Sequence, residues 1–183
     1  MWLEITKLIV AALVPIVVVV VGWKLNRSLK GFEHAQWANQ KLVEKKLQLF
    51  DEIMPRLNDL YCFYNFVGNW KDITPGDVIA IKRALDKKIN VYSAVLGNIF
   101  LEAYASFMKC AFETYVAEGA DAKIRSVISG YDGDRKMHCS YQWKEEWDSL
   151  FPIPASYDKT EFQLRYAAVE SAFQSAIGVT VDR

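Results

Sequence analysis

The chain has 183 residues and no net charge, with 22 lysines and arginines against 22 aspartates and glutamates. This length suits one globular domain, or one domain with a membrane segment, and the neutral charge argues against binding double-stranded DNA through a broadly basic surface. Two histidines and three scattered cysteines leave few residues for a metal site, and Cys62, Cys110 and Cys139 are expected to be reduced thiols.

The first 25 residues predict a transmembrane helix. From Leu8 to Trp23 no side chain is charged or strongly polar, and Val17–Val21 are five consecutive valines. This apolar stretch gives about 24 Å of helix, slightly less than the ~30 Å hydrocarbon core of a bilayer. Trp2 and Trp23 extend it to about 31 Å and suit aromatic belts at both interfaces. We therefore expect a span from about Trp2 to Leu25.

Two other interpretations of this segment are less favourable. A cleaved signal peptide would need a small-residue cleavage site, which residues 22–27 lack. A buried core helix would normally keep some polar character, and this segment has no polar face.

Flanking charge gives the orientation of the span. Lys24, Arg27 and Lys30 follow it, whereas only Lys7 precedes it, so the positive-inside rule places the N-terminus outside and residues 26–183 in the cytoplasm. Residues 1–30 carry four cations and one anion, and residues 31–183 carry 18 cations and 21 anions. We expect a membrane anchor with a basic collar over 1–30 and a mildly acidic cytoplasmic domain over 31–183.

The predicted span contains residues suited to self-association. Ala11 and Ala12 form a small-residue patch at which helices can approach closely, and Pro15 frees the backbone carbonyl of Ala11. Since no charged residue lies within the apolar stretch, the mouth of any pore would be set by Asn26 and Arg27.

Helical periodicity dominates the rest of the chain. A first amphipathic helix is expected from Val43 to Tyr64, with a kink at Pro55. Its predicted core positions step by four and three residues: Val43, Leu47, Phe50, Met54, Leu57, Tyr61 and Tyr64. A second helix is expected to start at Thr74-Pro75-Gly76-Asp77, which has the residues of a capping box. Its apolar stripe runs to Ile99. Gly97-Asn98 would end the helix, and the alternative is a continuous helix into the next segment.

The expected fold class is all-α, an antiparallel bundle of four main helices. A third helix is expected from Phe100 to Tyr115, closed by Gly119, and a last one from Phe162 to Ile177, closed by Gly178. Between these two, residues 120–128 and 142–150 are expected to form short helices, and residues 130–134 a loop. No strand is predicted.

Several kinds of catalytic and binding site are not supported by the sequence. Phosphate-binding glycine motifs are absent, and the carboxylate pairs lack the further ligands of a di-metal or calcium site, so no cofactor or metal is expected. Helical-bundle ribonucleases use an Arg-x(4–6)-His pattern, for which the chain offers two candidate pairs. Arg27 and His34 lie at the membrane collar, and the gap between Arg135 and His138 is too short.

Aromatic residues at 143, 147 and 151 are spaced to share one helical face. The simpler interpretation is that they pack a short helix against the bundle. The alternative is a docking surface, for which the candidates are Arg135, His138, Trp143 and Trp147, with Lys123 and Arg125 as a basic rim.

This layout resembles the small membrane-tethered helical effectors of bacterial phage-defence systems, and it is similar to the membrane accessory protein of type VI-B CRISPR systems. The features that carry the resemblance are the span at Leu8–Trp23, the abutting bundle, and Trp143-x-x-x-Trp147 before a final helix. The resemblance implies a place in the bacterial inner membrane, an RNA-guided defence partner, and a homo-oligomeric pore that compromises an infected cell's envelope. That family's bundle is similar to the HEPN ribonuclease fold, but this bundle lacks the Arg-x(4–6)-His signature, so no catalytic residue is carried over.

The sequence thus leaves three functions open. The first is a non-enzymatic membrane effector whose span self-associates into a pore-like or membrane-perturbing oligomer in antiviral defence. The second is a membrane-anchored adaptor that binds a cytoplasmic partner. The third is a HEPN-like ribonuclease.

Overall fold

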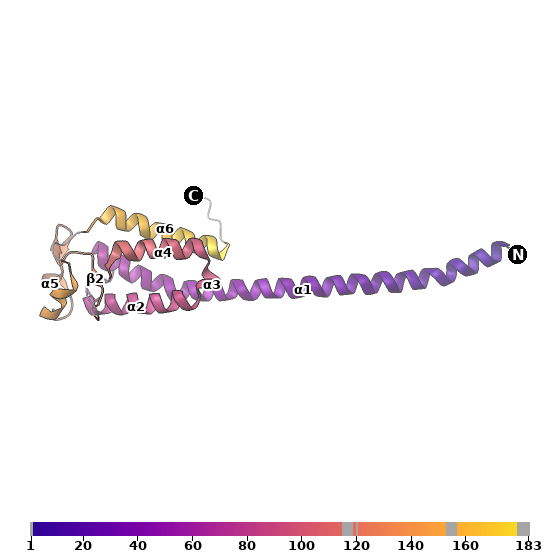
Figure 1. Cartoon of the computed structure of the whole chain (residues 1–183), viewed down its shortest axis with the longest axis horizontal. Coiled ribbons are helices and arrows are strands. Elements are labelled where there is room, and N and C mark those ends of the chain that lie inside the picture. The colour runs from indigo at the N-terminus through magenta and orange to yellow at the C-terminus, as the bar shows by residue number, and fades with distance from the viewer. Residues whose placement is uncertain (1, 115–118, 120, 153–156, 179–183) are drawn as a thin grey trace. The chain divides into compact units, whose positions relative to one another are not determined.

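The computed structural model describes residues 2–114, 119, 121–152 and 157–178, without the side chains of residues 3–6 and 8–14. These residues divide into two compact units, Met1–Glu44 and Lys45–Arg183. The chain is mostly helical, which confirms the all-α fold class (Figure 1). Within the part that the structure describes, no helix combines the length and apolar character needed to cross a membrane.

Helix α1 (Trp2–Asn65) runs without interruption through Gly31 and Pro55. Its last residues belong to the second unit, where they form a bundle with α2 (Pro75–Val91), α4 (Asn98–Ala111) and α6 (Lys159–Ile177). Consecutive main helices of this unit run in opposite directions (Figure 1). The four main helices of the predicted bundle are therefore confirmed.

Local capping signals fix the helix ends that the sequence placed correctly. The hydroxyl of Thr74 accepts a hydrogen bond from the Asp77 backbone N–H at 3.0 Å, and the Asp77 carboxylate accepts one from the Thr74 N–H at 2.9 Å. This reciprocal pair is the predicted capping box. Gly178 ends α6 with a left-handed φ of 87°, a conformation that glycine adopts without steric cost.

Other boundaries differ from the prediction. The second helix ends at Val91, and the short α3 (Ser93–Leu96) precedes a break at Gly97. Helix α4 ends at Ala111 rather than at Tyr115, which lies outside the described residues, so Gly119 does not close a helix. The stretch 142–150 forms only a 3-10 helix, η1 (Glu145–Leu150), whose N-terminus has no side-chain cap.

The described residues contain four very short strands, although the sequence predicted none. Strand β1 (Phe112–Glu113) pairs antiparallel with β2 (Lys123–Ile124), with Phe112 opposite Ile124. Strand β3 (Ser129–Gly130) pairs with β4 (Gly133–Asp134) in a hairpin, and α5 (Arg135–His138) follows directly. The predicted helix over residues 120–128 is therefore wrong. A two-residue strand is too short to show an alternating pattern, and only its partner defines it.

The buried face of α1 is offset from the predicted one. Val43 and Leu47 are exposed, whereas Leu49, Ile53 and Leu60 are fully buried beside the correctly predicted Leu57 and Tyr64. The other predicted positions, Phe50, Met54 and Tyr61, are partly buried against the core. Ile99, predicted as core, is also exposed. Apolar residues occupy more than one face of this stretch of α1, so periodicity alone allows two registers, and packing against the other helices selects one.

Aromatic rings fill the centre of the second unit. Tyr64 of α1 stacks on Phe162 of α6 with ring centroids 4.4 Å apart, and Phe107 of α4 lies 5.2 Å from the same ring. Nearer the other end of α6, Phe173 lies 4.6 Å from Phe100. The Tyr64 hydroxyl donates a hydrogen bond to the Ala111 carbonyl, so the polar group of this buried ring has a partner.

Arg135 is buried at the end of the bundle, with only 1% of its surface exposed. Its guanidinium donates to the carbonyls of Val127 and Phe63, at 2.9 and 2.8 Å, and to the Ser126 hydroxyl at 3.1 Å. It lies between two rings, 3.8 Å from the centroid of Phe63 and 4.0 Å from that of Phe66. Arg135 was a candidate for the alternative docking surface, and its burial contradicts that role, because Nε and Nη2 donate inside the fold and the side chain is not accessible to a partner.

Phe66 adopts a left-handed backbone conformation to reach this position, with φ of 58°. Such a conformation is unfavourable for a residue with a side chain, by about 1–2 kcal/mol. A Cβ atom at Gly133 would lie 3.1 Å from the Phe66 ring, so this ring is confined between Gly133 and Arg135. The cation–π contact helps to hold Phe66 in place.

We expect Arg135→Lys to lower the free energy of unfolding by roughly 2 kcal/mol or more, because an ammonium cannot match the planar guanidinium and leaves buried acceptors unpaired. Chemical denaturation of the full chain in mild detergent, followed by tryptophan fluorescence, measures this. Arg83→Lys is the matched control, because Arg83 is exposed and its ion pair with Asp121 tolerates lysine. Equal losses in both variants would contradict the role of Arg135.

Alkaline pH should destabilise the second unit. Burial raises the pKa of five tyrosines: Tyr64, Tyr104, Tyr141, Tyr157 and Tyr166. For Tyr141 and Tyr166 the pKa rises to about 12. Unfolded tyrosines ionise near pH 10, so the stability that these phenols confer is present below pH 10 and is lost as the pH rises towards 12. Burial lowers the pKa of Arg135 to about 10, which acts in the opposite sense, but five groups outweigh one.

The measurement is the thermal unfolding midpoint between pH 8 and 11, together with phenolate absorbance. Tyr166→Phe should reduce the loss of stability above pH 10, whereas Tyr131→Phe should not, because Tyr131 is fully exposed. A midpoint that stays constant to pH 11 would contradict this expectation.

Candidate functional site

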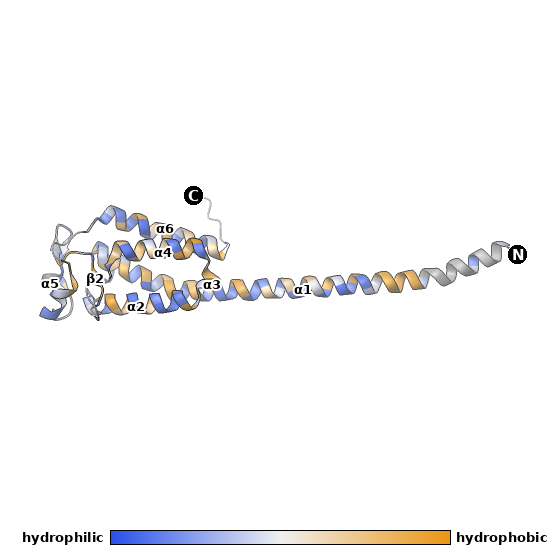
Figure 2. Ribbon diagram, viewed as in Figure 1, coloured by the Kyte–Doolittle hydropathy of each residue, from blue (hydrophilic) through white to orange (hydrophobic). Residues whose placement is uncertain are grey.

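The first unit presents apolar side chains on its surface. Six consecutive residues, Ile16–Val21, are each 49–69% exposed, and Trp23 follows at 64%. Figure 2 shows this apolar run in the N-terminal part of α1, next to the grey segment whose side chains are not described. Six residues cover every face of a helix, so this stretch has no polar side to turn towards water.

The remaining residues predicted for the span are placed only in part. Trp2 and Pro15 are exposed, while the side chains of Ala11 and Ala12 lie outside the described part of the chain. The small-residue patch at Ala11 and Ala12 therefore stays a prediction.

The predicted pore-mouth residues, Asn26 and Arg27, lie on the exposed surface of α1. The Arg27 guanidinium lies 5.6 Å from the centroid of the Trp23 ring. A cation over an indole suits the interfacial region of a bilayer, where the ring and the charge meet different environments. This arrangement agrees with a basic collar directly after the apolar stretch.

Trp143 and Trp147 are half-buried and contact each other edge to face, with centroids 5.6 Å apart. They do not share one helix, since Trp143 precedes η1. The Trp143 indole donates to the Asp148 carboxylate at 2.8 Å, and Lys136 pairs with the same carboxylate at 2.7 Å. These two bonds lower the pKa of Asp148.

Packing explains Trp143 better than docking does. Its ring lies 6.2 Å from that of the buried Phe151, and it packs against the hydrophobic core. Of the proposed docking residues, His138 is exposed and Trp147 is half-buried, while Arg135 is buried. The same burial of Arg135 removes it as the partner of His138 in a ribonuclease site.

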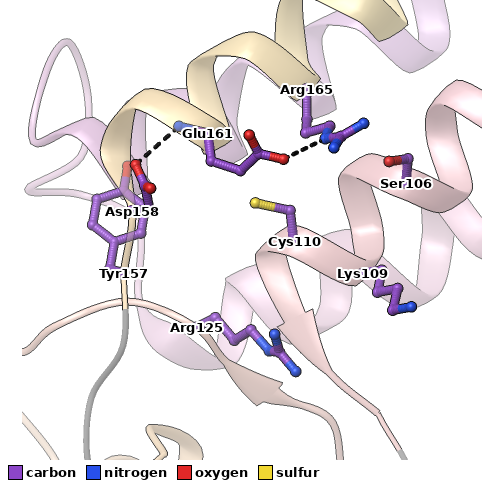
Figure 3. A pocket seen from close by; sticks show the side chains of 8 residues that line it. All are labelled: Ser106, Lys109, Cys110, Arg125, Tyr157, Asp158, Glu161 and Arg165. Carbon is purple, nitrogen blue, oxygen red and sulfur yellow. Dashed lines mark hydrogen bonds and ion pairs between the residues drawn. The ribbon is translucent and has the colours of Figure 1, made fainter.

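A pocket of about 760 Å³ lies in the second unit, where the sequence predicted no site (Figure 3). Helix α4 contributes Ser106, Lys109 and Cys110, and the segment after β2 contributes Arg125. The remaining wall is formed by Tyr157 and Asp158, directly before α6, and by Glu161 and Arg165 of α6. Residues as far apart in the sequence as Ser106 and Arg165 meet here, so no local motif signals the pocket. Arg125 was noted in the sequence only as part of a possible basic rim.

The charges of this pocket are partly paired. The Asp158 carboxylate accepts a hydrogen bond from the Glu161 N–H at 3.0 Å and caps α6, and the Glu161 carboxylate binds the Arg165 guanidinium at 2.6 Å. In the described residues, no carboxylate forms an ion pair with Lys109 or Arg125. The pocket therefore holds cations in excess.

Cys110 lies at the centre of this pocket, with its sulfur facing Glu161 and Arg165 of α6 (Figure 3). Burial raises the pKa of its thiol, and the charges of Glu161, Arg165, Arg125 and Asp158 all act on it. The thiol is consequently neutral near pH 7, which does not suit a nucleophile. Among the described residues, no group of histidine, cysteine and acidic side chains could hold a metal ion.

Comparison with known proteins gives no relative. No protein-family model, no curated protein and no solved structure matches the chain.

Proposed function

We propose that the chain is a single-pass membrane protein whose N-terminal helix self-associates in the bilayer into a pore-like or membrane-perturbing oligomer, and that it serves bacterial antiviral defence. The N-terminus would lie outside and the helical bundle in the cytoplasm. The observation that carries the proposal is the run of exposed apolar side chains at Ile16–Val21, which requires a non-aqueous environment or another apolar surface.

Three features support a bilayer as that environment. The apolar run continues the uncharged segment that begins at Leu8 in the sequence. Trp23 and the cations Lys24, Arg27 and Lys30 follow it on exposed positions, in the order expected at a cytoplasmic interface. The second unit, in contrast, has a buried hydrophobic core of its own.

Self-association is supported by the small-residue patch that Ala11 and Ala12 form in the sequence. Lipid and a second copy of the helix are both apolar, so packing decides whether helices associate. The phage-defence role is supported by the resemblance of the layout alone. An anchored adaptor remains the second candidate, because exposed His138 and half-buried Trp147 offer a surface that a protein partner could contact.

We expect the full-length chain to remain in the membrane pellet after a carbonate wash. Val19→Lys should shift it towards the supernatant, because a lysine in the apolar part of a span is unfavourable, by up to about 2.5–3.5 kcal/mol at its centre. Val91→Lys is the matched control, since Val91 is an equally exposed valine of the second unit. Wild-type protein in the supernatant would contradict the proposed location.

Replacing residues 2–25 with an unrelated monomeric transmembrane helix separates the two candidate functions. A pore-forming chain should lose both its oligomer, measured as particle mass in detergent, and its ability to release dye from liposomes. An adaptor should keep its protection of phage-infected cells with the foreign anchor. A wild-type chain that is monomeric at every concentration would contradict the oligomer.

A further inference from the structure

We propose that the pocket between α4, the segment after β2, and the start of α6 binds a small phosphorylated molecule, with the phosphate on Arg125 and with Lys109 and Arg165 adding positive charge. This inference goes beyond the proposed membrane function and does not depend on it.

Arg125 is the best placed phosphate ligand in the pocket. It has no ion pair among the described residues and is only half-buried, so its guanidinium is accessible. A planar guanidinium matches two phosphate oxygens at once. Its backbone is fixed by a hydrogen bond of 2.9 Å from the Arg125 N–H to the Ala111 carbonyl, so the site is attached to the rigid end of α4.

Two neighbouring groups add to this site. Arg165 uses its Nε to bind Glu161, and no bond is recorded in the described residues for its other two nitrogens. The Tyr157 hydroxyl is buried as an atom and has no hydrogen-bond partner in the part of the chain that the structure describes. A buried hydroxyl without a partner is unfavourable by about 1–3 kcal/mol. Because Tyr157 lines the pocket, a rotation of its side chain on binding would bring the hydroxyl to a ligand oxygen.

The size and the acidic groups of the pocket indicate that the ligand is more than a bare phosphate ion. A volume of about 760 Å³ is typical of sites for small organic molecules. Asp158 and Glu161 would repel a bare anion but can accept hydrogen bonds from the hydroxyl or amino groups of an organic part. A nucleoside monophosphate or a sugar phosphate has this combination of groups.

The test is calorimetric titration of the full chain in detergent with adenosine monophosphate, glucose 6-phosphate, adenosine and inorganic phosphate. At least one phosphorylated organic probe should bind at least tenfold more tightly than adenosine and inorganic phosphate. Arg125→Gln and Lys109→Gln should each weaken that binding by about tenfold or more. Arg83→Gln and Lys87→Gln are the matched controls, because both residues are exposed on α2 and lie outside the pocket.

A second readout needs no variant. The bound probe should slow alkylation of Cys110, read peptide by peptide in a mass spectrometer, because Cys110 lines the pocket. Cys139 is the internal control, since it is also half-buried and lies outside the pocket. The proposal is overturned if neither phosphorylated organic probe binds, if inorganic phosphate binds as tightly as they do, or if Cys110 is not protected.

Discussion

The buried guanidinium of Arg135 is the contact on which the end of the bundle depends. It joins three parts of the chain that are distant in sequence: the end of α1 through Phe63, the strand-linking segment through Ser126 and Val127, and α5, which carries the residue itself. A buried cation normally needs a carboxylate, and here carbonyl dipoles and two aromatic faces replace it. Its Nη1 atom has no partner among the described residues. The positive charge is therefore stabilised by the carbonyl and ring contacts alone and not by a neighbouring negative charge.

This contact also positions the candidate pocket indirectly. Ser126 follows Arg125 in the chain, so fixing Ser126 on Arg135 restricts where the Arg125 backbone can lie. The opposite wall comes from α6, which the Tyr64–Phe162 stack holds against the bundle. The pocket is therefore bounded by two rigid attachments, and ligand affinity does not have to include the cost of ordering its walls.

Sequence reasoning succeeded where a signal is local and failed where distant contacts decide. The capping box at Thr74 and the helix stop at Gly178 need only their own neighbours, and both are confirmed. The burial of Arg135 and the pairing of Phe112 with Ile124 depend on partners elsewhere in the chain. An arginine in a polar loop normally indicates a solvated surface, and no pattern around residue 135 announces Phe63 as its partner. For the same reason the pocket could not be predicted.

The two units differ in whether their apolar side chains are buried by the chain itself. In the second unit, rings such as Phe107 and Phe173 are fully buried by other helices of the same chain, so its stability is internal. In the first unit, the apolar side chains of Ile16–Val21 gain no such burial among the described residues. At about 1.5 kcal/mol or more for each valine or isoleucine fully buried, moving this run out of water is favourable by several kcal/mol. That driving force belongs to the first unit alone. Under the proposed function, a ligand bound in the second unit would therefore act by biasing contacts between chains, because the energy of membrane association would come from the first unit.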